Sequence, residues 1–387
     1  MHFPEIDFAS DAVPNLYELL ADIRAKERMA TIRWFGQPAT LFTHYDDVIT
    51  GLRDDDVFPA GVAYRRLVEN VQGRTMMTMS GEEHRLHRSL VNAAFTRSTS
   101  RDLRGSTIDP LAHRLVDAFA SRAEADLVAD FTRHFSFEII IAILGLPQAD
   151  IDEVHRWVHD IFNSGLDLPG AQRAAEELSA FVIPCIEARR REPRDDLLSD
   201  LATAEIDGRR LSNEEILSFV RLLFPAGSDT TYLATGSMIV GVLSSPDVIE
   251  KLVADPSERV WAVEEALRWE SPVPILQRWV ERETEWNGVV VPEGQLLWAA
   301  GAANRDPDHF EAPDEFRPER HERTLLSFGQ GPHFCLGTHL ARAEMASALD
   351  VLLDRLPNLR LKGDAAPAIT SGLLRGPTTI PVVFDPS

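Results

Sequence analysis

Apolar positions recur at helical spacing through most of the chain. Apolar residues three or four apart mark one face of a helix, whereas short apolar runs between turn residues mark strands. We therefore expect helices over residues 11–26, 111–122, 131–144, 150–162 and 170–191. Strands are expected over residues 39–43, 289–291, 295–298 and 380–384, with residues 292–294 joining the second to the third. The pattern predicts a mainly α fold with a smaller β region.

The longest apolar pattern runs from Ser212 to about Leu243. Ser212 with Glu215 three residues later has the pattern of a capping box, which begins a helix. Pro225 lacks the amide that would bond four residues back, so we expect the helix to loosen and to open a groove beside Asp229 and Thr230. A buried Asp-Thr-Thr sequence can equally be a bend whose side chains bond their own backbone. Taken alone, this segment fits either interpretation.

Cys335 lies in the segment 328–337, which carries Gly329, Gly331 and Gly337. Such glycines allow a tight turn and the close approach of a flat ligand. A predicted helix with apolar positions from Leu340 onward follows, and its N-terminal amides would lower the pKa of the cysteine. The other cysteine is Cys185, so a four-cysteine metal site is excluded within this chain. A lone cysteine can also be a small buried apolar residue. A single thiolate ligand on iron instead suggests haem.

This segment resembles the haem-binding signature of the cytochrome P450 family of haem-thiolate monooxygenases. The match comprises Phe328, the three glycines, a basic residue and Cys335. The resemblance implies that Cys335 binds the iron of haem b and that Phe328, Gly329 and Gly337 surround the cofactor.

The segment 222–231 resembles the oxygen-binding site of the same family. There Asp229 and Thr230 would relay protons to bound dioxygen, with Ala226 and Gly227 beside the haem. Pro225 stands where the family more commonly has a small or aliphatic residue.

Two further sets of residues match the family. Glu265 and Arg268, in a helix that Asp255, Pro256 and Glu258 would begin, together with Arg320, resemble a buried structural triad. Burying three charges costs heavily unless each is paired, so we interpret the triad as a structural contact that stabilises the fold behind the cysteine loop. The resemblance also implies that the haem propionates bind four basic residues: His84, Arg88, Arg278 and His333. Each of the four could instead be a solvated surface residue.

The substrate pocket can be located only through the resemblance. It implies contributions from the segment before His84 and from segments that include Leu222, Leu223, Val273, Ile275 and Leu373, the last within residues 371–374. These residues are apolar or small, so we expect an uncharged hydrophobic substrate. A few aliphatic contacts discriminate weakly between such molecules, so the sequence does not identify the compound.

Composition limits the cellular setting. The 387 residues are 44% hydrophobic and 26% charged, which is typical of an ordinary soluble globular protein, and no linker or repeat divides them. We expect one domain over residues 1–387. The net charge of −22 repels nucleic acid and anionic membranes. The start lacks the features of a signal peptide and no apolar run is long enough to span a bilayer, so we expect a cytoplasmic monomer.

The resemblance also implies the reaction. One oxygen atom from O2 would be inserted into the substrate, with electrons from NAD(P)H delivered by a ferredoxin-type iron–sulfur protein and its reductase. Arg342 and the segment Arg101 to Arg104 are candidate contacts for that partner, although scattered surface charges would look the same. Two alternatives stay open: a peroxide-driven peroxygenase, which would need no Asp229–Thr230 pair, and a non-catalytic protein that binds haem or a ligand.

Overall fold

The computed structural model describes residues 2–206, 208–363, 365–370 and 373–385. Its α helices are α1 Leu16–Lys26, α2 Tyr45–Arg53, α3 Ala60–Gln72, α4 Gly81–Asn92, α5 Arg97–Leu103, α6 Asp109–Asp117, α7 Arg133–Leu144, α8 Ile151–Phe162, α9 Leu168–Arg191, α10 Leu197–Thr203, α11 Asn213–Leu243, α12 Pro246–Ala254, α13 Arg259–Trp269, α14 Ala300–Ala303 and α15 Thr338–Arg355. Its strands are β1 His2–Asp7, β2 Met29–Trp34, β3 Gln37–Phe42, β4 Glu124–Asp126, β5 Glu205–Ile206, β6 Arg209–Arg210, β7 Leu276–Val280, β8 Thr284–Trp286, β9 Val289–Val291, β10 Gly294–Trp298, β11 Arg360–Leu361, β12 Ile369–Thr370, β13 Gly376–Pro377 and β14 Pro381–Val383.

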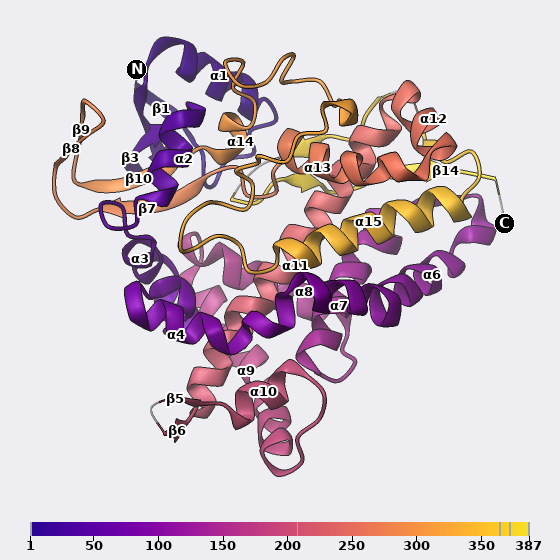
Figure 1. Ribbon diagram of the computed structural model, residues 1–387, viewed down its shortest axis with the longest axis horizontal. Helices are drawn as coiled ribbons and strands as arrows, with labels where there is room; N and C mark the ends of the chain where they lie inside the picture. Colours follow the sequence, from indigo (N-terminus) through magenta and orange to yellow (C-terminus); the bar gives the residue numbers. More distant parts are fainter. Residues whose placement is uncertain (1, 207, 364, 371–372, 386–387) are drawn as a thin grey trace.

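Helix α11 forms the centre of the helical region (Figure 1) and packs against α7, α8, α9, α13 and α15. Its start has the predicted capping box: the Glu215 amide donates to Ser212 Oγ at 3.2 Å, and the Ser212 amide donates to the Glu215 carboxylate at 2.7 Å. The helix continues through Pro225 without interruption. The expected loosening therefore does not break the helix, because Phe224 and Pro225 are buried and packing holds the turn in place.

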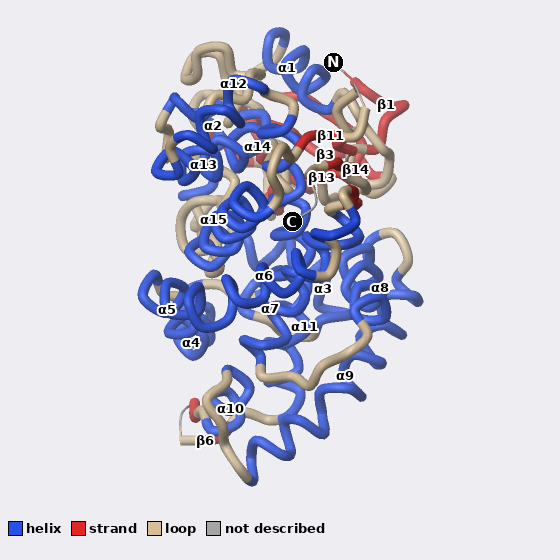
Figure 2. Tube along the Cα trace, turned by 90° about the vertical axis from the view of Figure 1, so that its right-hand side faces the viewer, coloured by secondary structure: helices blue, strands red, loops and turns tan. Residues whose placement is uncertain are grey.

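The largest sheet lies at one end of the molecule, near α1, and helices form most of the remainder (Figure 2). Its strand order is β1-β2-β3-β10-β7. Strand β10 pairs in parallel with β3 and antiparallel with β7, whereas β9 pairs with β8. Residues 292–294 thus join strands of two different sheets. The mainly α fold with a smaller β region is confirmed.

Two predicted helices differ from the structure by more than two residues at one end. The helix expected over 11–26 begins at Leu16, because side chains bond the preceding backbone into a turn. Asp7 Oδ1 accepts the Ala9 amide at 3.0 Å, and Asp11 Oδ2 accepts the Asp7 amide at 2.8 Å. The helix expected over 111–122 ends at Asp117, and a 3₁₀ turn over Ala120–Arg122 follows before the chain enters β4.

A buried cluster of charges joins distant parts of the chain. The Arg305 guanidinium lies 4.0 Å from the ring centroid of Tyr17 in α1, and it pairs with Glu270 at 3.1 Å. Glu270 also pairs with Arg375 at 2.7 Å. Burial, followed by the charge of Glu270, raises the pKa of Tyr17. The cluster, defined by Tyr17, Glu270, Arg305 and Arg375, therefore holds the N-terminal, middle and C-terminal segments together.

Helix length and hydropathy give one finding about membranes. Within the described ranges, no single helix is long and apolar enough to cross a bilayer. Helices α11 and α12, which meet at a bend of 100°, satisfy the length and composition criteria only as a pair.

Candidate active site

The loop before α15 holds Cys335 in a fixed position. The Cys335 amide donates to the Phe328 carbonyl at 2.9 Å, and the Phe334 amide donates to the Gly331 carbonyl at 3.0 Å. Gly331 has φ of 77°, and a Cβ there would lie 2.8 Å from the carbonyl oxygen of Leu52, so only glycine fits. Gly329 also has a positive φ, of 69°.

Gly337 differs from the other two glycines of the loop. It is the N-cap of α15 with φ of −80°, and no described atom lies within 4 Å of the position that a Cβ would take. Backbone conformation therefore does not require a glycine there. The absence of a side chain at Gly337 leaves open space two residues after Cys335.

Burial raises the pKa of the Cys335 thiol. The Gly337 amide and the charges of Arg88 and Arg342 act in the opposite direction and do not outweigh it. The Gly337 amide thus lowers the pKa of the thiol, as expected for an amide at the start of a helix, but loss of hydration is the larger effect. A coordinated metal ion would remove the proton outright.

The four predicted propionate ligands come from three parts of the fold and gather beside the cysteine loop. His84 in α4 stacks on His333 of the loop, with ring centroids 4.1 Å apart. Arg88, one turn after His84, donates to the Phe334 carbonyl at 2.7 Å. Arg278 in β7 is buried and donates to the Gln277 carbonyl at 2.8 Å. Burial, followed by the charges of His84, Arg278 and Arg88, lowers the pKa of His333 to about 3.

The polar atoms of this cluster fit a haem. Nε of Arg278 and Nε2 of His333 are both buried and have no hydrogen-bond partner among the described residues. Buried polar groups are normally paired, and a buried guanidinium such as that of Arg278 is costly without an anion. The two carboxylates of a haem would supply acceptors for these groups, while the half-buried Cys335 would supply a thiolate for the iron.

Asp229 and Thr230 lie on α11 in different environments. The Asp229 side chain is buried, its Oδ1 has no partner in the described structure, and burial raises its pKa to about 8. The Thr230 hydroxyl donates to the Ala226 carbonyl at 2.6 Å. Ala226 is exposed on an otherwise buried helix, and a Cβ on Gly227 would lie 3.0 Å from Ile140. The Thr230 side chain thus bonds the backbone of its own helix, as expected for a bend that satisfies itself. The Asp229 side chain makes no such bond.

Glu265, Arg268 and Arg320 form one buried network. Arg268 makes two bonds of 2.8 Å to the Glu265 carboxylate, and Arg320 Nε donates to the same carboxylate at 3.2 Å. The Arg317 amide adds a bond of 2.7 Å to Glu265, a contact that the side-chain pattern could not reveal. Arg268 also donates to the carbonyl of Pro313 at 2.7 Å. The network therefore ties α13 to the loop that follows α14.

The start of α13 differs in one respect from the prediction. Asp255 accepts the Ser257 amide at 3.0 Å and begins a 3₁₀ turn over Pro256–Glu258, after which α13 follows. Glu258 does not act as a capping carboxylate. It pairs instead with Lys251 at 3.0 Å, because the 3₁₀ turn directs its side chain toward α12.

The predicted substrate residues belong to two apolar clusters. Leu222 and Leu223 are part of the large cluster around α11, whereas Ile275 and Leu373 pack in the cluster beside the main sheet. Val273 is half-buried. Ser371 and Gly372 lie outside the described residues. The structure thus does not join the whole set into one cluster.

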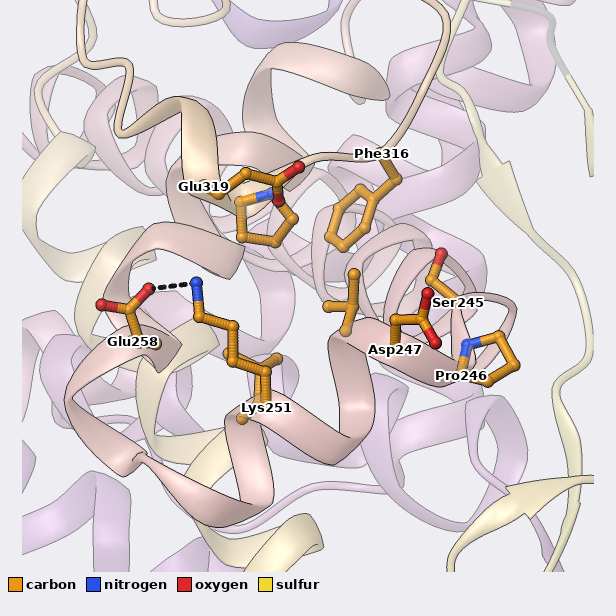
Figure 3. A pocket seen from close by; sticks show the side chains of 10 residues that line it. Ser245, Pro246, Asp247, Lys251, Glu258, Phe316 and Glu319 are labelled. Carbon is orange, nitrogen blue, oxygen red and sulfur yellow. Dashed lines mark ion pairs between the residues drawn. The ribbon is translucent and has the colours of Figure 1, made fainter.

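A pocket of about 360 Å³ lies elsewhere, between α12 and the segment around Phe316 (Figure 3). The Lys251–Glu258 ion pair lies along it. None of the predicted haem or substrate residues lines this pocket.

One buried acid was not recognised as such from the sequence. Glu344 in α15 is buried, its Oε2 has no partner among the described residues, and burial raises its pKa well above the usual value. The burial of Glu344 could not be predicted from the spacing of apolar residues, because α15 is covered by other helices on more than one side.

Comparisons with known proteins identify the family. The family model described as Cytochrome P450 matches residues 10–258 and 260–383. The steroid C26-monooxygenase of Mycobacterium tuberculosis is 32% identical over 402 residues, which cover 99% of this chain and 98% of that protein. The 6-deoxyerythronolide B hydroxylase of Saccharopolyspora erythraea is 33% identical over 401 residues, covering 98% of each. The solved structure of the Bacillus subtilis 168 cytochrome P450 PksS has a TM-score of 0.88 at 32% identity and covers 96% of this chain and 97% of that one.

A mainly α fold, with a cysteine loop packed beside two arginines and a stacked pair of histidines, fits the class of haem-thiolate proteins. The chain belongs to the cytochrome P450 family. It is a cytochrome P450 monooxygenase, and the resemblance identified from the cysteine loop is confirmed.

Proposed function

We propose that this monooxygenase hydroxylates an uncharged hydrophobic small molecule, with electrons passed from NAD(P)H through a reductase and a ferredoxin-type iron–sulfur protein. The observation that carries the proposal is the placement of Cys335 beside Arg88 and Arg278, with Nε of Arg278 and Nε2 of His333 buried and without a partner among the described residues. We further propose a cytoplasmic monomer with no nucleic-acid or membrane partner. The two free cysteines and the net charge of −22 support that setting.

The site residues would divide the work of holding the cofactor. Cys335 would bind the iron, and His84, Arg88, Arg278 and His333 would pair with the propionates. Phe328, Gly329 and Gly337 would flank the haem on the cysteine side, with Ala226 and Gly227 opposite. When bound, haem supplies the redox chemistry that activates dioxygen.

Asp229 and Thr230 would deliver protons. Because the pKa of Asp229 is raised to about 8, this acid carries a proton at neutral pH and can donate it. The Thr230 hydroxyl now donates to the Ala226 carbonyl, so it would have to rotate away from that bond to pass a proton onward. The presence of this pair favours a monooxygenase over a peroxide-driven peroxygenase.

The substrate class follows from apolar side chains. Leu222, Leu223, Val273, Ile275 and Leu373 carry no charge, and we infer that they contact an uncharged hydrophobic molecule. The names of the two similar relatives specify a steroid and 6-deoxyerythronolide B. Both are large and weakly polar, so we propose compounds of this type as the first to test.

Carbon monoxide provides the test of cysteine ligation. The reduced protein under carbon monoxide should show the red-shifted Soret band of a thiolate-ligated haem, and a band at the position of histidine-ligated globins would overturn the assignment of Cys335. A screen for compounds that convert the iron from low to high spin would then find the substrate.

Product formation then distinguishes a monooxygenase from a peroxygenase and from a non-catalytic binding protein. Product formed with NAD(P)H and a ferredoxin system supports the proposal. Product formed from peroxide alone supports a peroxygenase, and tight ligand binding without product in either assay supports a binding protein.

A further inference from the structure

Asp229 needs a path to water if it is to donate protons repeatedly. Its side chain is 2% exposed and its Oδ1 has no partner among the described residues. After each donation the carboxylate must recover a proton through groups within hydrogen-bond reach or through a bridging water. The question is therefore which polar groups lie between this acid and the surface.

Tyr232 is the next group along the same face of α11. It lies three residues after Asp229, so the two side chains are neighbours on the helix, and the acid's charge acts on the phenol. Its ring faces His155 of α8, with ring centroids 6.0 Å apart at an interplanar angle of 60°. Phe137 of α7 contacts both rings and forms an apolar wall beside them.

Beyond Asp229, Tyr232 and His155, the groups nearest to solvent are polar. Arg133, the first residue of α7, pairs with Asp152 at 3.4 Å, and 79% of the Asp152 side chain is exposed. Nε of Arg133 is buried without a partner in the described structure, which leaves a donor for a water molecule. His155 lies near both charges and carries on its outer side the exposed His159, at a centroid distance of 6.0 Å.

We propose that Tyr232 and His155 form the route by which Asp229 exchanges protons with solvent, along the seam where α7, α8 and α11 meet. The inference rests on the proposed role of Asp229. In one cycle Asp229 gives its proton toward the site and receives one by way of the Tyr232 hydroxyl, with water bridging the groups. The phenol is reprotonated from one nitrogen of His155 while the other nitrogen takes a proton from solvent beside Arg133 and Asp152. Rotation of the hydroxyl and of the imidazole then restores the starting arrangement.

The chemistry of the two groups suits this task. A neutral imidazole has one nitrogen that accepts a proton and another that donates one, and a phenol can also do both. Burial, with the charge of Arg133, lowers the pKa of His155 to about 4, so the ring is neutral at pH 7. Tyr232 stays protonated at that pH, because burial raises its pKa.

Hydrogen exchange at Asp229 tests the route without turnover. In the haem-loaded protein at about pH 6, the infrared band of the protonated Asp229 carboxyl is identified by its loss in Asp229→Asn, and its shift is followed after mixing with D2O. We expect His155→Phe and Tyr232→Phe each to slow this exchange by about tenfold or more. The matched control is His159→Phe, one turn further along α8, which should exchange at the wild-type rate.

Exchange at the wild-type rate in either His155→Phe or Tyr232→Phe would overturn the route. If His155→Phe fails to fold, His155→Gln keeps a polar side chain that cannot carry the proton and should show the same slowing. A wild-type protein that makes no product would overturn the proposed function, whereas the exchange comparison decides the route independently.

Discussion

Asp229 shows how burial alone changes the chemistry of one residue. Its carboxyl is buried and has an unpaired oxygen, so the charged form is costly and the pKa rises to about 8. In the unfolded chain the same group would ionise near its ordinary value. Folding is therefore linked to pH through this side chain.

The sign of that link gives the first prediction. Between roughly pH 4 and pH 8 the unfolded chain releases the Asp229 proton while the folded protein keeps it, so rising pH destabilises the fold by up to about 1.4 kcal/mol per pH unit. Asp229→Asn removes this dependence. The melting temperature of wild type, relative to that of the variant, should fall as pH rises through this window. A constant difference would contradict the raised pKa.

Thr230 gives the second prediction. Thr230→Ala removes the hydroxyl that bonds the Ala226 carbonyl, and a carbonyl on this exposed turn can bond water instead, so haem binding should persist. Without the hydroxyl, proton delivery fails, and most NAD(P)H oxidation should yield hydrogen peroxide. The ratio of product to NAD(P)H consumed measures this. Thr230→Ser, which keeps the hydroxyl, should retain coupling, and unchanged coupling in Thr230→Ala would remove the relay assignment.

At the scale of elements, the Glu265 carboxylate is the junction between α13 and the loop after α14. Arg320→Ala takes away one of its two cations inside the protein while Arg268 stays paired, so the loss of this charge-assisted hydrogen bond costs about 1.5–3 kcal/mol. We expect a lower melting temperature and loss of haem on dilution.

Arg317→Ala is the matched control, because this side chain is 35% exposed and pairs with Glu319 at the surface. Its effect should stay within about 1 kcal/mol. An equal fall in melting temperature in the two variants would mean that the Arg320–Glu265 contact contributes no more to stability than a surface ion pair.

The cysteine loop makes a separate prediction for the glycine turn. Gly331→Ala places a Cβ 2.8 Å from the Leu52 carbonyl oxygen at a φ of 77°, which costs about 1–3 kcal/mol in strain and shifts the loop. The reduced carbon monoxide spectrum should lose part of its thiolate band. Gly105→Ala, where a Cβ meets nothing within 4 Å, should leave the spectrum unchanged.

What the sequence could predict at this scale depended on local signals. The capping box of α11 and a tight turn at the glycines of the cysteine loop were expected from neighbouring residues, and the loop turns at Gly329 and Gly331 with positive φ. The burial of Glu344 and the Arg317 amide bond to Glu265 depend on which elements meet in space, and no periodicity encodes that. The triad and propionate residues were found only through family resemblance, since their spacing carries no signal alone.

For the whole molecule, net charge sets how a redox partner can approach. A chain of charge −22 repels an acidic ferredoxin unless some face is locally basic. Arg342 is occupied by Glu264 at 2.7 Å, and Arg104 bonds Asp109 at 3.3 Å, so neither is a free contact. Arg101 is 79% exposed and lies 3.9 Å from Asp102, which leaves it the most accessible of the candidates named from the sequence.

The last prediction concerns the surface around Arg101. Arg101→Glu should slow reduction by an acidic ferredoxin about two- to tenfold at low salt, and the difference from wild type should shrink as salt is added. Stopped-flow reduction under carbon monoxide measures the rate. Arg85→Glu reverses a charge that Glu82 already neutralises and should have a smaller effect. A salt-independent rate in wild type would exclude electrostatic docking.

The cluster of Tyr17, Glu270, Arg305 and Arg375 restricts how this chain can be recombined with its relatives. A chimera that exchanges only the first forty or so residues would replace Tyr17 while retaining two arginines and one glutamate selected to fit around it. Replacing Tyr17 removes the ring that faces the buried guanidiniums of Arg305 at 4.0 Å and Arg375 at 5.2 Å, while the charges themselves stay buried. Crossovers that transfer all four positions together should yield folded hybrids more often than crossovers of equal length that separate them.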